Sequence, residues 1–207
     1  MSTENSQTLP SRQRTHGDAA AARRWKKWVI LIVIVIAIAA IGNAYLVLRR
    51  PNLPDEVDGV TVYNNLSNAV VAGPVDYDIH PPVGGPHAAL PQLCGFYRVP
   101  VADENIVASL ATGAVWIAHQ PGLSGDDYET LLDIVHGQYD VLLTPYPGLQ
   151  HKFVLTAWGR QLALDDVHDS RVDLFVNVYQ NRAWAPNVDD SCAEGLGLPL
   201  PTNTTGR

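Results

Sequence analysis

The strongest strand signal in the chain is Gly113-Ala114-Val115-Trp116-Ile117-Ala118-His119. This apolar run is almost continuous, which is typical of a central strand covered on both faces of a sheet. A helix is predicted next, with Ser124 as its N-cap and Gly137 at its end. Residues 139–144 then form a second strand. Strand, helix and strand together predict a right-handed βαβ crossover, provided that the two strands are parallel.

Shorter patterns complete a small domain around this crossover. Because a tight Pro/Gly turn follows residue 144, the next strand should run antiparallel. The other predicted elements are strands at residues 60–63, 74–77, 153–158 and 161–164, a short helix at 104–110, and a last helix from its cap Asp169 to Asn181. The predicted fold class is α+β, or a small α/β fold, with a mixed sheet.

Residues 28–48, WVILIVIVIAIAAIGNAYLVL, form an uncharged segment that is apolar on every side. As a helix, this segment would rise roughly 32 Å, and the hydrocarbon core of a bilayer is about 30 Å thick. Trp28 and Tyr45 suit the two membrane interfaces as amphipathic anchors. One transmembrane helix is therefore predicted, with a buried helix of a soluble domain as the alternative.

The charges around this segment predict its orientation. Six Lys or Arg residues precede it and only Arg49 and Arg50 follow directly, so the N-terminus should be cytoplasmic and the domain after it extracytoplasmic. Gly42-Asn43-Ala44 has the small-residue spacing of a cleavage site, which leaves a cleaved signal peptide as the alternative. The apolar run before Asn43 is long for a signal-peptide core and favours an uncleaved anchor.

The two predicted sides of the membrane differ in charge. Residues 1–50 carry eight Lys or Arg and two Asp or Glu, a net charge of +6, whereas residues 51–207 carry six and nineteen, a net charge of −13. An exported domain with this charge will not bind nucleic acid through its phosphates. It favours cations or basic partners, although acidic residues also serve solubility alone.

These observations predict five segments along the chain. They are a disordered cytoplasmic tail at residues 1–27, a transmembrane helix at 28–48, a linker at 49–56, the extracytoplasmic domain at 57–192 and a flexible tail at 193–207.

Cys94 and Cys192 are the two cysteines of the chain, and both fall in the compartment that should be oxidising. A disulfide between them is predicted, which would tie the C-terminal segment to the central loop. The alternative is that Cys94 is a nucleophile or a thiolate ligand, but no base is evident beside it.

The loop Asp78-Ile79-His80-Pro81-Pro82-Val83-Gly84-Gly85-Pro86-His87 is rich in proline and glycine. Proline restricts the backbone conformations of such a loop, whereas glycine allows additional ones. Together with Leu93-Cys94-Gly95-Phe96-Tyr97, which follows, this stretch should be an ordered loop, neither helix nor strand, and such loops often hold binding residues. His80 and His87 are candidate ligands of zinc or copper, and Asp76, Asp78 and His119 could come near them. The alternative is that each histidine only bonds to the loop backbone.

No catalytic constellation is evident in the sequence. The chain has no Gly-x-Ser-x-Gly, no His-Glu-x-x-His and no phosphate-binding loop, so no catalytic residue and no cofactor is predicted. Arg160, which follows a strand beside Trp158, is a candidate for an anion site or for bracing a carboxylate, and bracing is the commoner role.

Several ordered motifs resemble a membrane-anchored domain family of unknown function from actinobacteria. The motifs are His-Pro-Pro-x-Gly-Gly-Pro-His at residues 80–87, Cys-Gly-Phe-Tyr at 94–97, Gly-Ala-Val-Trp at 113–116, Pro-Tyr-Pro-Gly at 145–148 and Ala-Trp-Gly-Arg-Gln at 157–161. The resemblance covers roughly residues 74–192.

The chain departs from this family at two positions. The resemblance implies a His-x-x-x-His pair on the helix before the Gly-Ala-Val-Trp strand, but Ala108 and Thr112 stand at those positions here. If the family binds a metal through four histidines, this chain lacks two of them. We therefore expect a non-catalytic, single-pass membrane protein that acts as an accessory subunit of a membrane-protein partner in the cell envelope. Metal binding by His80 and His87 is the alternative.

Overall fold

The structure, a computed structural model, describes residues 28–29, 31–40, 53–180 and 185–200 of the 207-residue chain. The chain divides into two compact units, Met1–Asn52 and Leu53–Arg207. In the first unit, residues 28–29 and 31–40 are helical, and their large apolar side chains are exposed. No helix within the described residues is both long and apolar enough to cross a membrane. Residues 1–27, 30 and 41–48, which belong to the predicted tail and spanning helix, lie outside the described residues.

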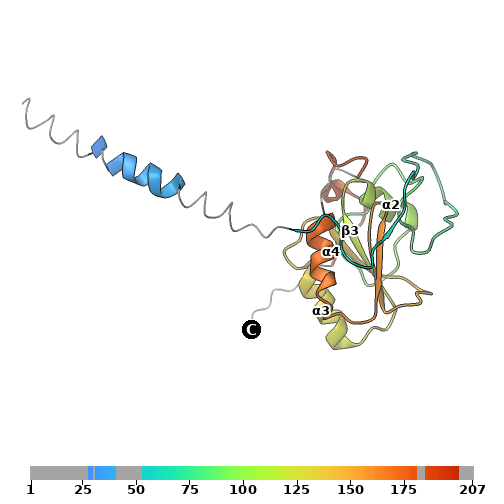
Figure 1. The fold of residues 1–207 in the computed structure, drawn as a ribbon. Coiled ribbons are helices and arrows are strands. Elements are labelled where there is room, and N and C mark those ends of the chain that lie inside the picture. The colour runs from blue at the N-terminus through green and yellow to red at the C-terminus, as the bar shows by residue number, and fades with distance from the viewer. Residues whose placement is uncertain (1–27, 30, 41–52, 181–184, 201–207) are drawn as a thin grey trace, which may run out of the picture. The chain divides into compact units, whose positions relative to one another are not determined.

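The second unit is built on a mixed sheet, as the sequence predicted, and this sheet has six strands (Figure 1). Its strands are β1 (Thr61–Val62), β2 (Gly95–Phe96), β3 (Val115–His119), β4 (Val141–Pro145), β5 (Phe153–Ala157) and β6 (Arg160–Leu164). Their order across the sheet is β1-β6-β5-β3-β4-β2. β4 pairs in parallel with both β3 and β2, and the other neighbours are antiparallel.

The predicted crossover is confirmed. Helix α3 (Gly125–Val135) connects β3 to β4, and these two strands are parallel. The Ser124 hydroxyl caps α3 by accepting a hydrogen bond from the backbone N–H of Asp127 at 3.3 Å. Gly137 follows the helix with a φ of 81°, which glycine adopts without strain. β5 is antiparallel as predicted, but it pairs with β3, on the opposite side from β4.

Two predictions before the crossover are wrong. Residues 74–77 form no strand, because Pro74 has no N–H and the backbone N–H of Val75 donates to the Glu104 side chain at 2.7 Å. Conversely, β2 lies within the region predicted as loop. β2 pairs with β4 so that Gly95 lies opposite Leu142. A strand of two residues is too short to give a periodic pattern, so the sequence does not reveal this long-range pairing.

Helices cover both faces of the sheet (Figure 1). α3 and α4 (Arg171–Tyr179) pack on one face against Ile117 and Leu143, whereas α2 (Asp103–Ala111) packs on the other against Trp116. Alternate residues of β3 thus enter two separate cores, and all five of its residues are buried. This explains the continuous apolar run that predicted a central strand.

The C-terminal segment pairs with the loop before β2. Residues 193–200 belong to the predicted flexible tail, yet Leu196 exchanges backbone hydrogen bonds with Pro91 and Leu93, at 2.7 and 2.8 Å. Leu200 donates to Phe96 at 3.0 Å. The described part of this segment is therefore tied to the domain by main-chain bonds, which its Pro/Gly-rich sequence did not indicate.

Arg171→Ala is expected to lower the stability of the chain at neutral pH and to leave it unchanged in strong acid. The Arg171 guanidinium donates to the Asp169 carboxylate at 2.6, 3.0 and 3.1 Å, and these bonds hold the pKa of that carboxyl at about 2 against its ordinary value of 3.8. A depressed carboxyl pKa stabilises the fold above 3.8, and this stabilisation is lost as the pH falls through about 2. Thermal unfolding midpoints of the full chain between pH 2 and 7 measure this effect.

Arg98→Ala is the matched control, because Arg98 is exposed and forms no ion pair with any described residue. A parallel pH profile for the two variants would contradict the role of the Arg171–Asp169 pair.

Candidate functional site

The loop that carries His80 and His87 is ordered and packed, as predicted. Residues 81–85 are buried. The Val83 carbonyl accepts from the Gly159 N–H at 2.7 Å, and the Pro81 carbonyl accepts from the Gln161 side chain at 2.9 Å. Gly84 has a φ of 143°, and a Cβ there would lie 2.8 Å from Leu66 and 3.2 Å from the Trp158 ring, so glycine is needed at this position. Two of the sequence motifs, at residues 80–87 and 157–161, therefore form one packed unit.

His80 faces a small polar network at the start of α2. Its Nδ1 lies 3.1 Å from the Tyr146 hydroxyl, which donates to the Asp103 carboxylate at 3.1 Å. Because the tyrosine proton is used in the bond to Asp103, His80 is the donor in the bond to Tyr146. Burial raises the pKa of the Asp103 carboxyl, and the bond from Tyr146 partly offsets this shift. Burial likewise raises the pKa of the Tyr146 hydroxyl.

His87 has a different environment, with a side chain that is only 2% exposed. Its Nδ1 lies 2.9 Å from the Gly85 carbonyl. Since a carbonyl only accepts, Nδ1 carries the proton, and in the neutral ring Nε2 is an acceptor. The ring packs edge-on against Trp158, and the His87 main chain bridges to residues 69–71. The loop thus holds this imidazole in one orientation.

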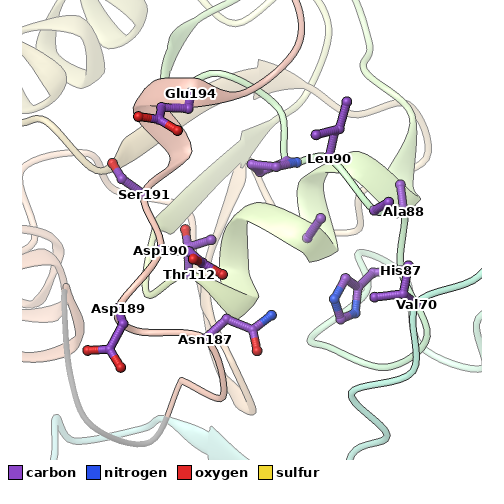
Figure 2. A pocket seen from close by; sticks show the side chains of 13 residues that line it. Val70, His87, Ala88, Leu90, Thr112, Asn187, Asp189, Asp190, Ser191 and Glu194 are labelled. Carbon is purple, nitrogen blue, oxygen red and sulfur yellow. The ribbon is translucent and has the colours of Figure 1, made fainter.

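His87 lines a cavity of about 490 Å³ (Figure 2). Figure 2 shows His87 on one side of the cavity and Asp189, Asp190 and Glu194 on the other. The remaining lining residues are Val70, Ala88, Ala89, Leu90, Pro91, Ala108, Thr112, Asn187 and Ser191. Three parts of the chain therefore form the walls: the segment after His87, one side of α2, and residues 187–194.

Hydrogen bonds to α2 hold the wall that follows His87. The Asn105 side chain donates to the Leu90 carbonyl at 2.8 Å, and the Gln92 N–H donates to the Asn105 carbonyl at 3.0 Å. The Ser109 hydroxyl donates to the Gln92 carbonyl at 2.8 Å, inside the core. These bonds tie the backbone of the loop to α2, and the bond from Ser109 provides the partner for a buried carbonyl.

The opposite wall, residues 187–194, is held at both ends. The Asn187 N–H donates to the Ala111 carbonyl at the end of α2, at 2.8 Å. Near the other end, the sulfur atoms of Cys192 and Cys94 lie 1.99 Å apart, at the distance of a disulfide. The cavity is therefore formed between braced segments of backbone, which makes it a preformed site.

The candidate metal ligands do not converge in the described residues. Among these residues, the one group of three His, Cys, Asp or Glu whose ligand atoms lie within 4.8 Å of one another is Cys94, Asp140 and Cys192. Its two sulfurs are paired with each other, which removes them as thiolate ligands. His80 and His87 have separate partners, so the described residues do not fit a three-ligand metal site at this loop. Metal binding by the two histidines stays a prediction that elemental analysis can test.

Arg160 lies at the start of β6, where its Nη1 donates to the Gly159 carbonyl at 3.1 Å. It does not line the cavity. The acidic wall was missed by the sequence reasoning, which assigned Asp189, Asp190 and Glu194 only to the end of the domain and its tail. The cluster of acids around Cys192 was the available signal, because a disulfide to Cys94 brings that segment to the loop.

A family model described as a protein of unknown function, DUF3105, matches residues 70–194, which is more than half of the chain. The chain belongs to the DUF3105 family. The match begins at Val70 and ends at Glu194, which are both lining residues of the cavity, so all of the cavity lies within the DUF3105 domain. Neither the curated proteins nor the solved structures include a match to this chain.

The cavity of this DUF3105 domain also contains the two positions at which the family resemblance implied histidines. Ala108 of α2 and Thr112, the C-cap residue directly after α2, line the cavity together with His87. The expected His-x-x-x-His pair would therefore face His87, not His80. The actinobacterial origin and the histidine pair of other members stay predictions.

Proposed function

We propose that this DUF3105 protein is a non-catalytic accessory protein, anchored in the membrane by residues 28–48, whose extracytoplasmic domain binds a membrane-protein partner. The observation that carries the binding role is the preformed cavity of about 490 Å³, whose walls are braced by main-chain bonds and by the Cys94–Cys192 pair. Braced cavities of this size favour binding, because little conformational entropy is lost when the ligand enters.

The anchor is supported by the first unit. The described helical residues 31–36 and 38 carry large apolar side chains, each between 49% and 64% exposed. A helical segment that is apolar all round suits a lipid environment. The six basic residues before it favour a cytoplasmic N-terminus.

A site-specific photo-crosslinker at Leu90 is expected to capture one discrete membrane protein in intact cells. Leu90 lines the cavity and is 51% exposed, so a partner seated there comes within reach. The matched control is the same crosslinker at Asp133, which is highly exposed on α3, on the other face of the sheet. Protease added outside spheroplasts should remove the domain and leave an N-terminal tag intact.

Capture that is equal at Leu90 and Asp133, or a tag digested with the domain, would contradict the proposal. So would a purified chain that turns over a substrate and loses this activity through one substitution.

A further inference from the structure

A second cavity lies at the carboxyl ends of the parallel strands, and its lining residues share none with the cavity of Figure 2. Its volume is about 300 Å³. We propose that this second cavity binds a small carboxylate with an O–H or N–H donor beside the carboxylate group, as in an α-hydroxy acid or the terminal residue of a peptide. The inference goes beyond the proposed partner-binding function and does not depend on it.

The first argument is the position of the second cavity. The strands β2, β4 and β3 are neighbours and run parallel. His119 and Pro145, the last residues of β3 and β4, line the cavity together with Arg98, which follows β2 by two residues. The chain leaves β2 for α2 on one face of the sheet and leaves β3 for α3 on the other. In open α/β sheets, ligands bind at the carboxyl ends of strands where the connections diverge in this way.

The second argument is a buried acceptor without a partner. The His119 side chain is only 6% exposed. Its Nδ1 lies 2.8 Å from the Gln120 carbonyl, and because a carbonyl only accepts, Nδ1 carries the proton. Burial lowers the pKa of this imidazole, so at neutral pH Nε2 is an acceptor. This Nε2 has no hydrogen-bond partner among the described residues, and a donor on a ligand in the cavity supplies one.

The third argument is a donor beside this acceptor. The Tyr128 ring, which also lines the second cavity, lies edge-on to the His119 ring with centroids 5.4 Å apart. The Tyr128 hydroxyl is buried, and its proton has no acceptor within the described part of the chain. Burial raises the pKa of this hydroxyl, and the nearby Arg98 guanidinium partly offsets the rise. Because a guanidinium only donates, the tyrosine proton is left for an oxygen of the ligand.

The charge of the second cavity favours an anion. Arg98 carries the one full charge among the described lining residues, although the domain has a net charge of −13. Arg98 is exposed and forms no ion pair with a described residue, so its guanidinium can bind a carboxylate through two parallel hydrogen bonds. Pro121, Leu123 and Pro145 add apolar lining for a short carbon skeleton. Cation, donor and acceptor thus match a carboxylate that has its own donor.

The test uses the full chain in a non-ionic detergent with three probes of nearly equal size. L-Lactate has the carboxylate and the donor, whereas propionate lacks the donor and lactamide lacks the charge. NMR titration at pH 7 should show lactate binding about tenfold more tightly than either analogue, because each analogue lacks one of the bonds that the cavity offers. Inorganic phosphate is the control for unspecific attraction of anions to Arg98.

Substitutions test the three polar groups separately. Tyr128→Phe removes only a hydroxyl and should weaken lactate binding about tenfold. Its matched control is Tyr139→Phe, which removes a hydroxyl from a side chain that is 88% exposed and should change the affinity less than about twofold. His119→Phe should abolish the preference for lactate over propionate, which a loss of packing alone does not do. Arg98→Gln should weaken lactate but not lactamide, whereas Arg160→Gln, at the opposite end of the strands, should weaken neither.

Equal binding of lactate and propionate, tighter binding of phosphate than of lactate, or no binding of lactate to the folded chain would overturn the inference. Circular dichroism shows which variants are folded, and the three probes with Tyr128→Phe decide the outcome if His119→Phe does not fold. Tighter binding of N-acetyl-L-alanine than of lactate identifies the terminal residue of a peptide as the source of the carboxylate. The reverse order identifies a free hydroxy acid.

Discussion

Reduction of the Cys94–Cys192 disulfide is expected to lower the free energy of unfolding by about 4.7 kcal/mol in the chain-entropy model. The two cysteines are 98 residues apart, so their bond closes most of the domain into one loop and removes many conformations from the unfolded chain. A typical domain is stable by only about 5–15 kcal/mol, so this loss is large. Urea unfolding of the full chain with and without a phosphine reductant measures it.

The Cys94→Ser, Cys192→Ser double variant is the control for this experiment. It should show the same loss as the reduced protein, and the reductant should have no further effect on it. An unfolding midpoint that reduction leaves unchanged would contradict the prediction.

Ala108→His combined with Thr112→His is expected to create a metal site in the cavity. Ala108 lies on α2 and Thr112 is the C-cap residue four positions later, and both line the cavity, so the two imidazoles would enter the space that His87 lines. Three imidazoles with an open fourth position are a common zinc arrangement. The purified double variant should retain about one Zn²⁺ per chain after dialysis, as measured by elemental analysis, and the unsubstituted chain should retain less.

Each single substitution is a control, because two imidazoles make a weaker site than three. His87→Gln in the double variant should reduce the retained zinc, which separates a cavity site from binding elsewhere. A folded double variant with no more zinc than the unsubstituted chain would show that the three positions do not converge.

The elements around the crossover were predictable because their signals are local. The apolar run of β3, the Ser124 cap and the glycine after α3 each depend on residues that are close in sequence. The strand at residues 74–77 was mispredicted because a distant carboxylate, Glu104, takes the N–H that a sheet would need. β2 was missed because its pairing with β4 joins residues almost fifty positions apart.

The candidate site was only partly predictable for the same reason. The Pro/Gly density predicted an ordered loop, and the structure confirms it. His80 and His87 lie seven positions apart, yet the path of the loop leaves one beside Tyr146 and the other in the cavity. Side-chain direction in a loop depends on packing, here against Trp158 and Gly159, and spacing alone does not encode it.

The sequence by itself determined four features of the chain. They are an apolar segment flanked by unequal charge, an acidic domain, a βαβ crossover and two cysteines suited to pairing. These features depend on local periodicity and on the number of charged residues and cysteines, and both can be read without coordinates. Only the tertiary structure decided that His87, α2 and residues 187–194 enclose one cavity, because these segments are far apart in sequence. Main-chain bonds and one disulfide hold them together, and such long-range contacts exist only in the folded chain.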